Sequence, residues 1–418
     1  MNKKEYKIHI IGAGVSGLIA ARVLEDNGYA PIVIEASDRV GGRLKTDIIS
    51  DFYLDHGFQV LLTAYPAVQK YLDFEALDLQ LFLPGASIFK NKKQKVIGDP
   101  IKDLSLLFPT LFSGIGNFTD KLKILRLNKQ LKKKSISNIF IEKEQTTYSY
   151  LLDFGFSNEI ITEFFKPFFS GIFLETKLET SSRMFEFIYK MFGEGSAAIP
   201  KYGIGEVPKQ LFQNLNNTKF IFNRKVTSVN DREIILDDTT VLESDFTIIA
   251  TESSDLISNL KLQPAEWNSC YTLYFVTQSR VISKRLIGLV HKEGALINNF
   301  FYHTSLNLSL KPVEELLSVT VIDKQNLGDK ALIERVKAEL NEICGIDDVV
   351  RFIKYYNLPK SLPKLSNLKY EVLPSETGLT KSLFLAGDTQ LNGSLNAAMI
   401  SGERAALGVV ETISNTVC

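Results

Sequence analysis

The sequence predicts an α/β protein, α+β overall, in which a Rossmann-like nucleotide-binding domain is interleaved with a second domain of mixed sheet plus helices. Three observations carry this prediction. A strand, a glycine-rich turn, a helix and a second strand follow one another within residues 7–43. Short strand-like segments that end in small residues return at 246–251 and 383–388. The segments between them differ in character, being rich in helical periodicity and aromatic residues.

The composition of the 418-residue chain excludes several classes of protein. Its apolar and charged contents, 45% and 23%, are ordinary for a soluble globular protein with two or three domains. The formal net charge is zero, so no nucleic-acid partner is expected. Cys270, Cys344 and Cys418 lie far apart, which argues against a disulfide framework or a zinc site and fits a reducing compartment. No window reaches about 18 apolar residues, so we expect a cytoplasmic protein.

The chain opens with the first strand, the glycine turn and the first helix. Residues 8–11 are apolar except for one histidine, as in a buried parallel strand. Gly12, Gly14 and Gly17 follow at the spacing that permits a tight turn, a close approach to pyrophosphate and close helix packing. Residues 18–24 continue at helical period, and the helix N-terminus offers unpaired N–H groups to phosphates.

A second strand at 32–34 ends in Glu35, which completes a dinucleotide-binding pattern. The acid stands about 20 residues after the glycines, where it can accept hydrogen bonds from an adenosine ribose. The alternative is an α/β unit whose glycines serve only turns. The strand, helix, strand and acid occur in the required order, which favours the dinucleotide site.

The segment Asp38-Arg39-Val40-Gly41-Gly42-Arg43 adds a second glycine pair and two arginines. In this position it resembles the GG-R extension of the FAD-dependent amine oxidase, protoporphyrinogen oxidase and phytoene desaturase superfamily. The resemblance implies an FAD cofactor, with the glycine pair against its phosphates and the arginine close to the flavin. No cysteine stands in 383–406, where some relatives attach FAD by a thioether, so we expect noncovalent FAD.

Residues 52–61 resemble the superfamily's D-x-G segment, which passes along the flavin ring after a short hairpin. Gly57 would let the backbone come near the ring system, and Gln59 is the polar side chain best placed to reach cofactor or substrate. For His56 we expect a surface or turn position, because the sequence spacing identifies no partner for its side chain.

Residues 65–198 form a predicted helical insertion, with helices expected at 148–156 and 158–165. Its many phenylalanines are expected to pack mostly in the core, while several could line an apolar substrate cavity. Within it, an apolar run at 104–118 precedes a lysine-rich run up to residue 134. This pair could lie on an anionic membrane, but a packed helix followed by a solvated basic helix is the preferred interpretation.

Residues 199–254 return to α/β character, with strands expected at 220–222, 225–229, 234–236, 241–242 and 246–251. The turn at 202–211 resembles the family's G-x-G-x-x-P-x-x-L. We do not expect a second dinucleotide site there, since no strand is predicted before it and Pro208 interrupts the helix pattern. The resemblance places the backbone of Val226 at the adenine.

Residues 255–365 form a second insertion, with strands at 271–276 and 317–321 and an amphipathic helix at 331–343. We expect a mixed sheet that roofs a cavity. The polar and aromatic cluster at 298–303 could face that cavity or form an exposed loop. We assign residues 1–64, 199–254 and 366–418 to the FAD-binding domain and 65–198 and 255–365 to the substrate-binding domain.

The last buried strand, at 383–386, is followed by a segment that closely resembles the superfamily's C-terminal A-G-D motif and helix. The resemblance places Asp388 at the ribityl or pyrophosphate part and the helix N-terminus at the flavin pyrimidine. Ala397 departs from the pattern, because relatives usually have glycine there. Together the motifs assign cofactor contacts to Gly12, Gly14, Val15, Ser16, Gly17, Glu35, Ala36, Arg39, Gly41, Gly42, Arg43, Gly57, Phe58, Gln59, Val226, Ala250, Thr251, Gly387, Asp388, Leu395, Asn396 and Ala397.

The resemblance implies hydride transfer from a substrate C–H to flavin N5, with reoxidation by oxygen or a quinone-like acceptor. Strand 271–276 lacks the lysine that amine oxidases place near N5, and Trp267 lies outside their aromatic-cage arrangement. Residues 355–359 and Lys364 resemble the proline-containing turn of protoporphyrinogen oxidases and desaturases. The first prediction for the function is therefore oxidation of a terpenoid, carotenoid or porphyrinogen-like substrate, and the second is oxidation of an amine. The third is an FAD-binding isomerase or binding protein. No catalytic residue and no metal site is predicted.

Overall fold

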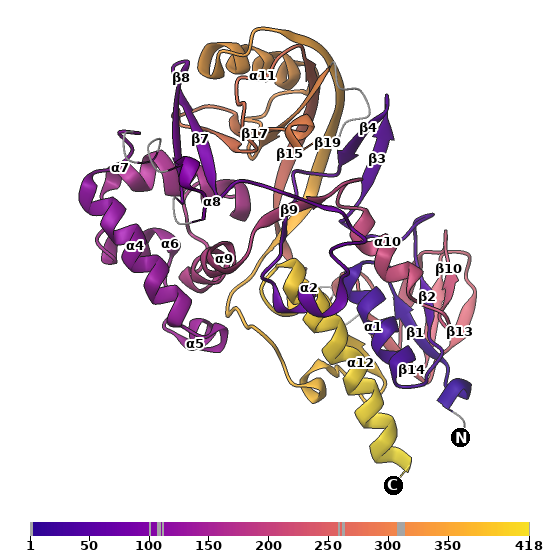
Figure 1. Ribbon diagram of the computed structural model, residues 1–418. Coiled ribbons are helices and arrows are strands. Elements are labelled where there is room, and N and C mark those ends of the chain that lie inside the picture. The colour runs from indigo at the N-terminus through magenta and orange to yellow at the C-terminus, as the bar shows by residue number, and fades with distance from the viewer. Residues whose placement is uncertain are drawn as a thin grey trace.

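A computed structural model of the chain describes residues 3–99, 102–106, 110, 113–257, 260, 264–306 and 314–417. Its elements form two main sheets, with helices packed around them (Figure 1). The predicted fold class is confirmed. In the described part of the chain, no helix is both long enough and apolar enough to cross a lipid bilayer.

A five-stranded sheet with the order β10-β2-β1-β14-β20 underlies the predicted nucleotide-binding part. All of its neighbouring strands are parallel. The chain adds strands on one side of β1 and later on the other, which makes the end of β1 a topological switch point where α/β proteins bind ligands. The strand bounds are Lys219–Ile221 for β10, Ile32–Ile34 for β2, Ile8–Ile11 for β1, Phe246–Ile249 for β14 and Leu383–Leu385 for β20.

Two helices pack against each other over this sheet, α1 (Val15–Asp26) and α12 (Leu395–Val417) (Figure 1). Gly402 makes the approach possible, because a Cβ there would lie far inside van der Waals contact of the Ser16 carbonyl oxygen. Gly17 lies equally close to the Gly12 carbonyl, as its predicted packing role requires. The helix α10 (Glu206–Gln213) also contacts α1.

A small antiparallel sheet covers the nucleotide-binding part through a core shared with Ile11, Ile34 and Ile249. It consists of β11 (Val226–Val229), β12 (Glu233–Leu236) and β13 (Val241–Glu243). A hairpin of β3 (Thr46–Ile49) and β4 (Phe52–Asp55) follows the glycine pair, as predicted. A three-stranded sheet, with α2 (Pro66–Tyr71) close by in sequence, contains β5 (Leu61–Leu62), β9 (Ala197–Pro200) and β6 (Leu79–Leu81).

The second part is built on a seven-stranded mixed sheet with the order β19-β15-β18-β17-β16-β7-β8. The helix α11 (Asp329–Cys344) shares a hydrophobic core with this sheet. Every neighbouring pair is antiparallel except β16 and β7. The strand bounds are Val349–Lys364 for β19, Glu266–Thr277 for β15, Glu315–Val321 for β18, Ile297–Tyr302 for β17, Ile287–Val290 for β16, Gly85–Lys90 for β7 and Lys93–Gly98 for β8.

Four sequence expectations are corrected by these elements. The region 79–98 is not helical, because it supplies β6, β7 and β8. The cluster 298–303 is not an exposed loop, since most of it belongs to the buried strand β17. Residues 355–359 form no turn, because they lie within β19. A strand, β9, does precede the turn at 202–211, and Pro208 lies in the first turn of α10, where its missing N–H costs no intrahelical bond.

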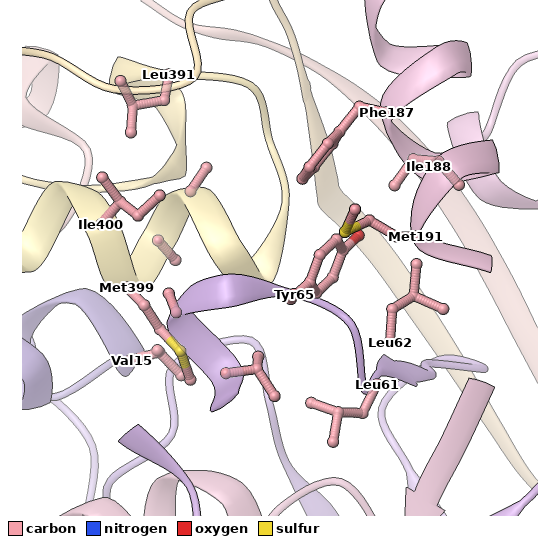
Figure 2. Close-up of a cluster of buried hydrophobic side chains, with 14 of the residues drawn as sticks. Val15, Leu61, Leu62, Tyr65, Phe187, Ile188, Met191, Leu391, Met399 and Ile400 are labelled. Carbon is pink, nitrogen blue, oxygen red and sulfur yellow. The ribbon is translucent and has the colours of Figure 1, made fainter. Parts of the chain in front are cut away.

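The remaining helices pack together to the left of the mixed sheet in Figure 1. Their phenylalanines are mostly core residues, as expected, with Phe165, Phe169 and Phe185 fully buried. Figure 2 shows how Tyr65 meets Phe187, with ring centroids 5.6 Å apart. The helices are α4 (Phe118–Lys133), α5 (Ile136–Ile141), α6 (Thr147–Asp153), α7 (Asn158–Ile160), a π-helix (Ile161–Phe165), α8 (Lys166–Phe173) and α9 (Ser182–Glu194).

Candidate active site: a cavity between the two parts

A cavity of about 1410 Å³ runs from the carboxyl ends of the parallel strands to the helices α4, α8 and α9. Ligand sites of single small molecules commonly occupy about 300–1,000 Å³, so this volume suits a cofactor together with a substrate. At the sheet end the cavity is lined by glycine turns and strand ends, among them Gly12, Gly14, Glu35, Ala250 and Gly387.

The N-terminus of α1 opens into this end of the cavity and is free of side-chain capping. Its N-cap is Gly14, and a Cβ at that position would meet only Gly42, at 3.9 Å. Gly12 has φ +101°, a backbone conformation that favours glycine, and its N–H donates to the Ile34 carbonyl at 2.8 Å. First-turn N–H groups without partners and a side-chain-free approach are what a pyrophosphate requires.

Glu35 follows β2 and lines the cavity beside that helix N-terminus. One carboxylate oxygen accepts the Ala13 N–H at 2.8 Å, and the other accepts the Ser37 N–H at 2.9 Å and hydroxyl at 2.7 Å. These bonds hold the carboxylate in place. A carboxylate has about four acceptor positions, so it retains capacity for a ribose hydroxyl.

The second glycine pair lies directly against the first turn. The Gly41 N–H donates to the Ala13 carbonyl at 2.9 Å, and Gly41 and Gly42 both have positive φ, +129° and +59°. Arg43, the next residue, forms an ion pair with the buried Asp388. This pair joins the N-terminal and C-terminal motifs, which are 345 residues apart, at the wall of the cavity.

Trp267 is a cavity residue that sequence reasoning missed. Its ring lies 5.2 Å from the Arg43 guanidinium carbon, a cation–π distance. The lone tryptophan was compared only with an aromatic-cage pattern that the chain lacks. Its place in β15, whose partner strand β19 also lines the cavity, would have been the available signal.

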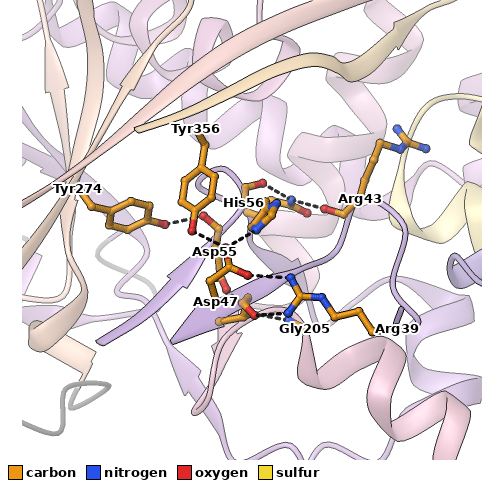
Figure 3. Close-up of polar contacts among 10 residues, drawn as sticks. Arg39, Arg43, Asp47, Asp55, His56, Gly205, Tyr274 and Tyr356 are labelled. Atoms are coloured by element: carbon orange, nitrogen blue, oxygen red, sulfur yellow. Dashed lines mark hydrogen bonds and ion pairs between the residues drawn. The ribbon is translucent and has the colours of Figure 1, made fainter. Parts of the chain in front are cut away.

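His56 occupies a polar network beside the cavity rather than an isolated turn position (Figure 3). Its Nε2 lies 2.8 Å from an Asp47 carboxylate oxygen, and its ring packs on Tyr356 at 4.5 Å between centroids. Asp47 also accepts hydrogen bonds from the Tyr356 hydroxyl at 2.8 Å and from Arg39 at 2.7 Å. Burial alone would raise the pKa of Asp47, but these bonds outweigh it and lower the pKa to about 2.

Gln59 lines the cavity, although its amide nitrogen is used to hold backbone. It donates to the carbonyl oxygens of Arg43 at 3.1 Å and His56 at 2.9 Å. Only the amide oxygen of Gln59 is therefore left to contact a ligand. Gly57 has φ +98° and also lines the cavity. Its closeness to a flavin ring stays a prediction.

Asp55 fastens the β3–β4 hairpin to the turn before α10 (Figure 3). One of its oxygens accepts both the Thr46 hydroxyl at 2.6 Å and the Ile204 N–H at 2.9 Å. Its backbone carbonyl accepts the Tyr274 hydroxyl at 2.9 Å. Burial raises the pKa of Asp55 to about 7, despite those two hydrogen bonds. The G-x-G-x-x-P turn thus supports the hairpin that carries the cavity wall.

The far end of the cavity is a chamber lined by aromatic and aliphatic side chains, and its aromatic residues are Phe164, Phe168, Tyr189 and Phe192. Polar groups enter it from the sheet, where Asn299 is 3% exposed. The Asn299 amide donates to the Thr320 hydroxyl at 3.3 Å. Phe58 of the D-x-G segment also lines the cavity, between the two ends of the binding region.

Most predicted cofactor contacts line the cavity. These are Gly12, Gly14, Val15, Ser16, Glu35, Gly41, Gly42, Arg43, Gly57, Phe58, Gln59, Ala250, Thr251, Gly387, Asp388 and Leu395. The others are not part of its lining, namely Gly17, Ala36, Arg39, Val226, Asn396 and Ala397. Asn396, for example, is fully buried and accepts the Ala67 N–H at 3.0 Å. All of these cofactor contacts remain predictions. Within the described residues, no group of three or more His, Cys, Asp or Glu side chains could hold a metal ion.

The sheet, the uncapped helix N-terminus and the continuous cavity define a dinucleotide-binding oxidoreductase fold with a substrate chamber. The flavin containing amine oxidoreductase family matches residues 15–410, and the chain belongs to that family. A solved structure of a putative protoporphyrinogen oxidase from Exiguobacterium sp. 255-15 superposes with a TM-score of 0.72 at 16% identity, covering 98% of this chain and 99% of that one.

Two curated relatives match shorter stretches of the chain. An L-amino-acid oxidase of Sistrurus catenatus edwardsii is 32% identical over 151 residues, 35% of this chain and 28% of that protein. Protoporphyrinogen oxidase 2 of Arabidopsis thaliana is 29% identical over 167 residues, 40% of this chain and 32% of that protein. The matched stretches thus span about a third of each relative's length.

Proposed function

We propose that this protein is an FAD-dependent oxidoreductase that takes a hydride from a C–H bond of a lipophilic small molecule, such as a terpenoid, carotenoid or porphyrinogen-like compound. Noncovalent FAD would occupy the sheet end of the cavity. Oxygen or a quinone-like molecule would accept the electrons. One observation carries the proposal: a single cavity joins the uncapped N-terminus of α1 to a chamber lined by aromatic and aliphatic side chains.

The chain's own residues supply the binding and orientation that such a reaction needs. The first turn of α1 and the Gly41–Gly42 pair would hold the phosphates, and Glu35 would hold the ribose. Arg43 and Asp388 neutralise each other at the cavity wall and would position the ribityl region. When bound, the flavin supplies a two-electron acceptor for a hydride.

Forming a double bond removes a proton from the carbon next to the one that loses the hydride. His56 is a titratable side chain that lines the cavity and is held in a fixed orientation. Asp47 occupies its Nε2, and no hydrogen bond of the described residues engages its Nδ1. We propose His56 as the group that receives this proton. The aromatic and aliphatic side chains of the chamber would keep water from the reacting carbons.

Amine oxidation is the second candidate. Its support comes from the family itself and from the L-amino-acid oxidase match. An ammonium ion needs a partner when it is buried, and aromatic and aliphatic side chains of the chamber offer none. Asp99 and Asp103 do line the cavity and could offer such a partner, so the two substrate classes require a direct comparison.

The test has two stages. Acid denaturation should release free FAD into the supernatant, and flavin absorbance retained by the precipitate would contradict noncovalent binding. The holoenzyme is then mixed anaerobically with terpenoids and porphyrinogens, and separately with polyamines, aromatic amines and amino acids. Flavin bleaching by the lipophilic set is expected. Bleaching by an amine alone would establish the second candidate, and no bleaching by either would favour an isomerase or a binding protein.

A further inference from the structure

The exposed face of α4 changes from apolar to basic halfway along the helix. Phe118, Leu122 and Leu125 are 70%, 51% and 45% exposed. They are spaced four and three residues apart, which places them on one helical face. The second half of that exposed face is cationic, with Arg126, Lys129, Lys132 and Lys133.

No acid balances these cations within α4, which the structure describes throughout. The only carboxylate of the helix is Asp120, which is fully buried. Asp120 forms the capping box with Asn117 and accepts the Ser157 hydroxyl at 2.6 Å. The exposed face therefore combines large apolar side chains with positive charge alone.

The same helix borders the substrate end of the cavity. Lys121, Ile124, Leu125 and Asn128 line it, so Leu125 belongs to both surfaces. Phe118 and Leu122 do not line the cavity, which means that their exposed area faces solvent beside it. Figure 1 shows α4 on the outside of the helical part, away from the five-stranded sheet.

Single exposed apolar residues are normal on protein surfaces, and Val241 is one such case at 54% exposed. Three on successive turns, continued by cations, form a surface whose apolar and basic parts match the acyl boundary and the anionic headgroups of a membrane. A twofold contact between copies would place basic segments against the same face of the partner, and like charges oppose that arrangement. Charge complementarity favours a bilayer with anionic lipids.

We propose that α4 docks the protein on the surface of an anionic lipid membrane. Phe118 and Leu122 enter the boundary between headgroups and acyl chains, and the cations of the second half contact lipid phosphates. In this orientation Leu125, which belongs to both the exposed face of α4 and the cavity lining, places that part of the cavity beside the bilayer. That a lipophilic substrate passes from bilayer to cavity rests on the proposed function, whereas the docking itself does not.

Sedimentation of the holoenzyme with sucrose-loaded vesicles tests the docking without any turnover. Vesicles of phosphatidylcholine alone are compared with vesicles that also contain phosphatidylglycerol. We expect binding to the anionic vesicles only, weakened by added salt. The Lys129→Glu/Lys132→Glu variant should bind at least about 30-fold more weakly, given the loss of two membrane-facing cations. Phe118→Gln/Leu122→Gln should bind at least about 10-fold more weakly.

Matched controls separate this face from general effects of charge and surface polarity. Lys292→Glu/Lys330→Glu makes the same charge change at two other exposed lysines, and Val241→Gln removes an exposed apolar residue of β13. Both should bind as the wild type does. Absence of vesicle binding, or equal binding by the α4 variants, would overturn the proposal. So would a dimer in solution that dissociates in Phe118→Gln/Leu122→Gln, because a second copy would then cover the face.

Discussion

At the scale of single residues, Glu35 shows how a strand-end acid is prepared for a ligand. Three donors from Ala13 and Ser37 fix its carboxylate at the cavity wall. Because the carboxylate is already ordered, a ligand hydroxyl binds it without the entropic cost of ordering that side chain. The sequence predicted the position of this acid, but not the donors that orient it.

We therefore expect Glu35→Ala to weaken FAD binding by about 1.5–3 kcal/mol, the range for hydrogen bonds to a charged group. The chain's single tryptophan, Trp267, lines the cavity and should report binding through its fluorescence during titration of the apoprotein. Glu233→Ala, which removes an exposed carboxylate of β12, is the control. Equal affinity in Glu35→Ala would show that Glu35 only completes a strand end.

Asp55 carries a second prediction at this scale, because its pKa of about 7 in the folded state lies well above its unfolded value. Between about pH 4 and 7 the unfolded chain loses this proton while the folded protein keeps it. The stability that Asp55 contributes should therefore fall as pH rises through that window and stay level above it. The fall is up to about 4 kcal/mol.

Asp55→Asn isolates this effect, because both donors meet one oxygen that asparagine retains. Urea unfolding of the two proteins from pH 4 to 8 gives the difference in their free energies of unfolding. The buried His9 and His303 also titrate in this window, since burial lowers the pKa of each to about 4. They are present in both proteins and cancel. A difference that does not change with pH would contradict the prediction.

At the scale of elements, α1 and α12 can pack closely because glycine, which has no side chain, lies at their contact. Gly402 lies against the Ser16 carbonyl, and both helices begin at the cavity. A shift of α12 would therefore move Leu395 and the wall beside it. Gly193, within α9, offers a contrast, because a Cβ there would meet nothing within 4 Å.

We expect Gly402→Ala to lower the free energy of unfolding by about 1–3 kcal/mol, as overpacking does, and to weaken FAD binding. Gly193→Ala should leave stability unchanged or raise it by about 0.4–1 kcal/mol, because alanine restricts the unfolded chain. Urea unfolding of the apoproteins measures both changes. Equal stability of the two variants would mean that the helices can separate at Gly402 without cost.

An element could be predicted from the sequence when the residues that determine it lie within the element itself. The strand, turn and helix of the first 35 residues carry their own periodicity and glycine spacing, so they were recognised. Strand β19 was mistaken for a turn because it contains Pro359 and Pro363. It lies at an edge of the sheet, and there a missing N–H breaks few ladder bonds. That edge position is set by tertiary structure alone.

Strands β7 and β8 were missed for a related reason. The segment 85–98 is rich in lysine and glycine, and β7 completes the sheet by pairing with β16, about 200 residues away. The candidate site shows the same division. Its glycines and acids stand in local motifs, whereas Trp267, Leu358 and Asn299 reach it from separate strands of the mixed sheet.

At the scale of the whole molecule, the cavity is built from segments of both main sheets and from the helices beside them. Its wall takes strand ends from the parallel sheet, the β19 segment from the mixed sheet and residues from the helices α1, α4, α8, α9 and α12. A ligand at the sheet end should therefore stabilise the folded state by mass action on all of them. A side chain at the far end should leave that gain unchanged, because it does not touch the ligand.

We expect saturating FAD, at about a thousandfold excess over Kd, to add about 4 kcal/mol to the stability of the apoprotein. This should appear as an upward shift of the thermal unfolding transition. Phe168→Ala, in the aromatic chamber, should lower the transition of apo and FAD-loaded protein equally, since it removes buried area from both. At the same FAD concentration, Glu35→Ala should reduce the shift itself. If Phe168→Ala reduced the FAD-dependent shift as much as Glu35→Ala, the cofactor and substrate ends of the cavity would not be separate sites.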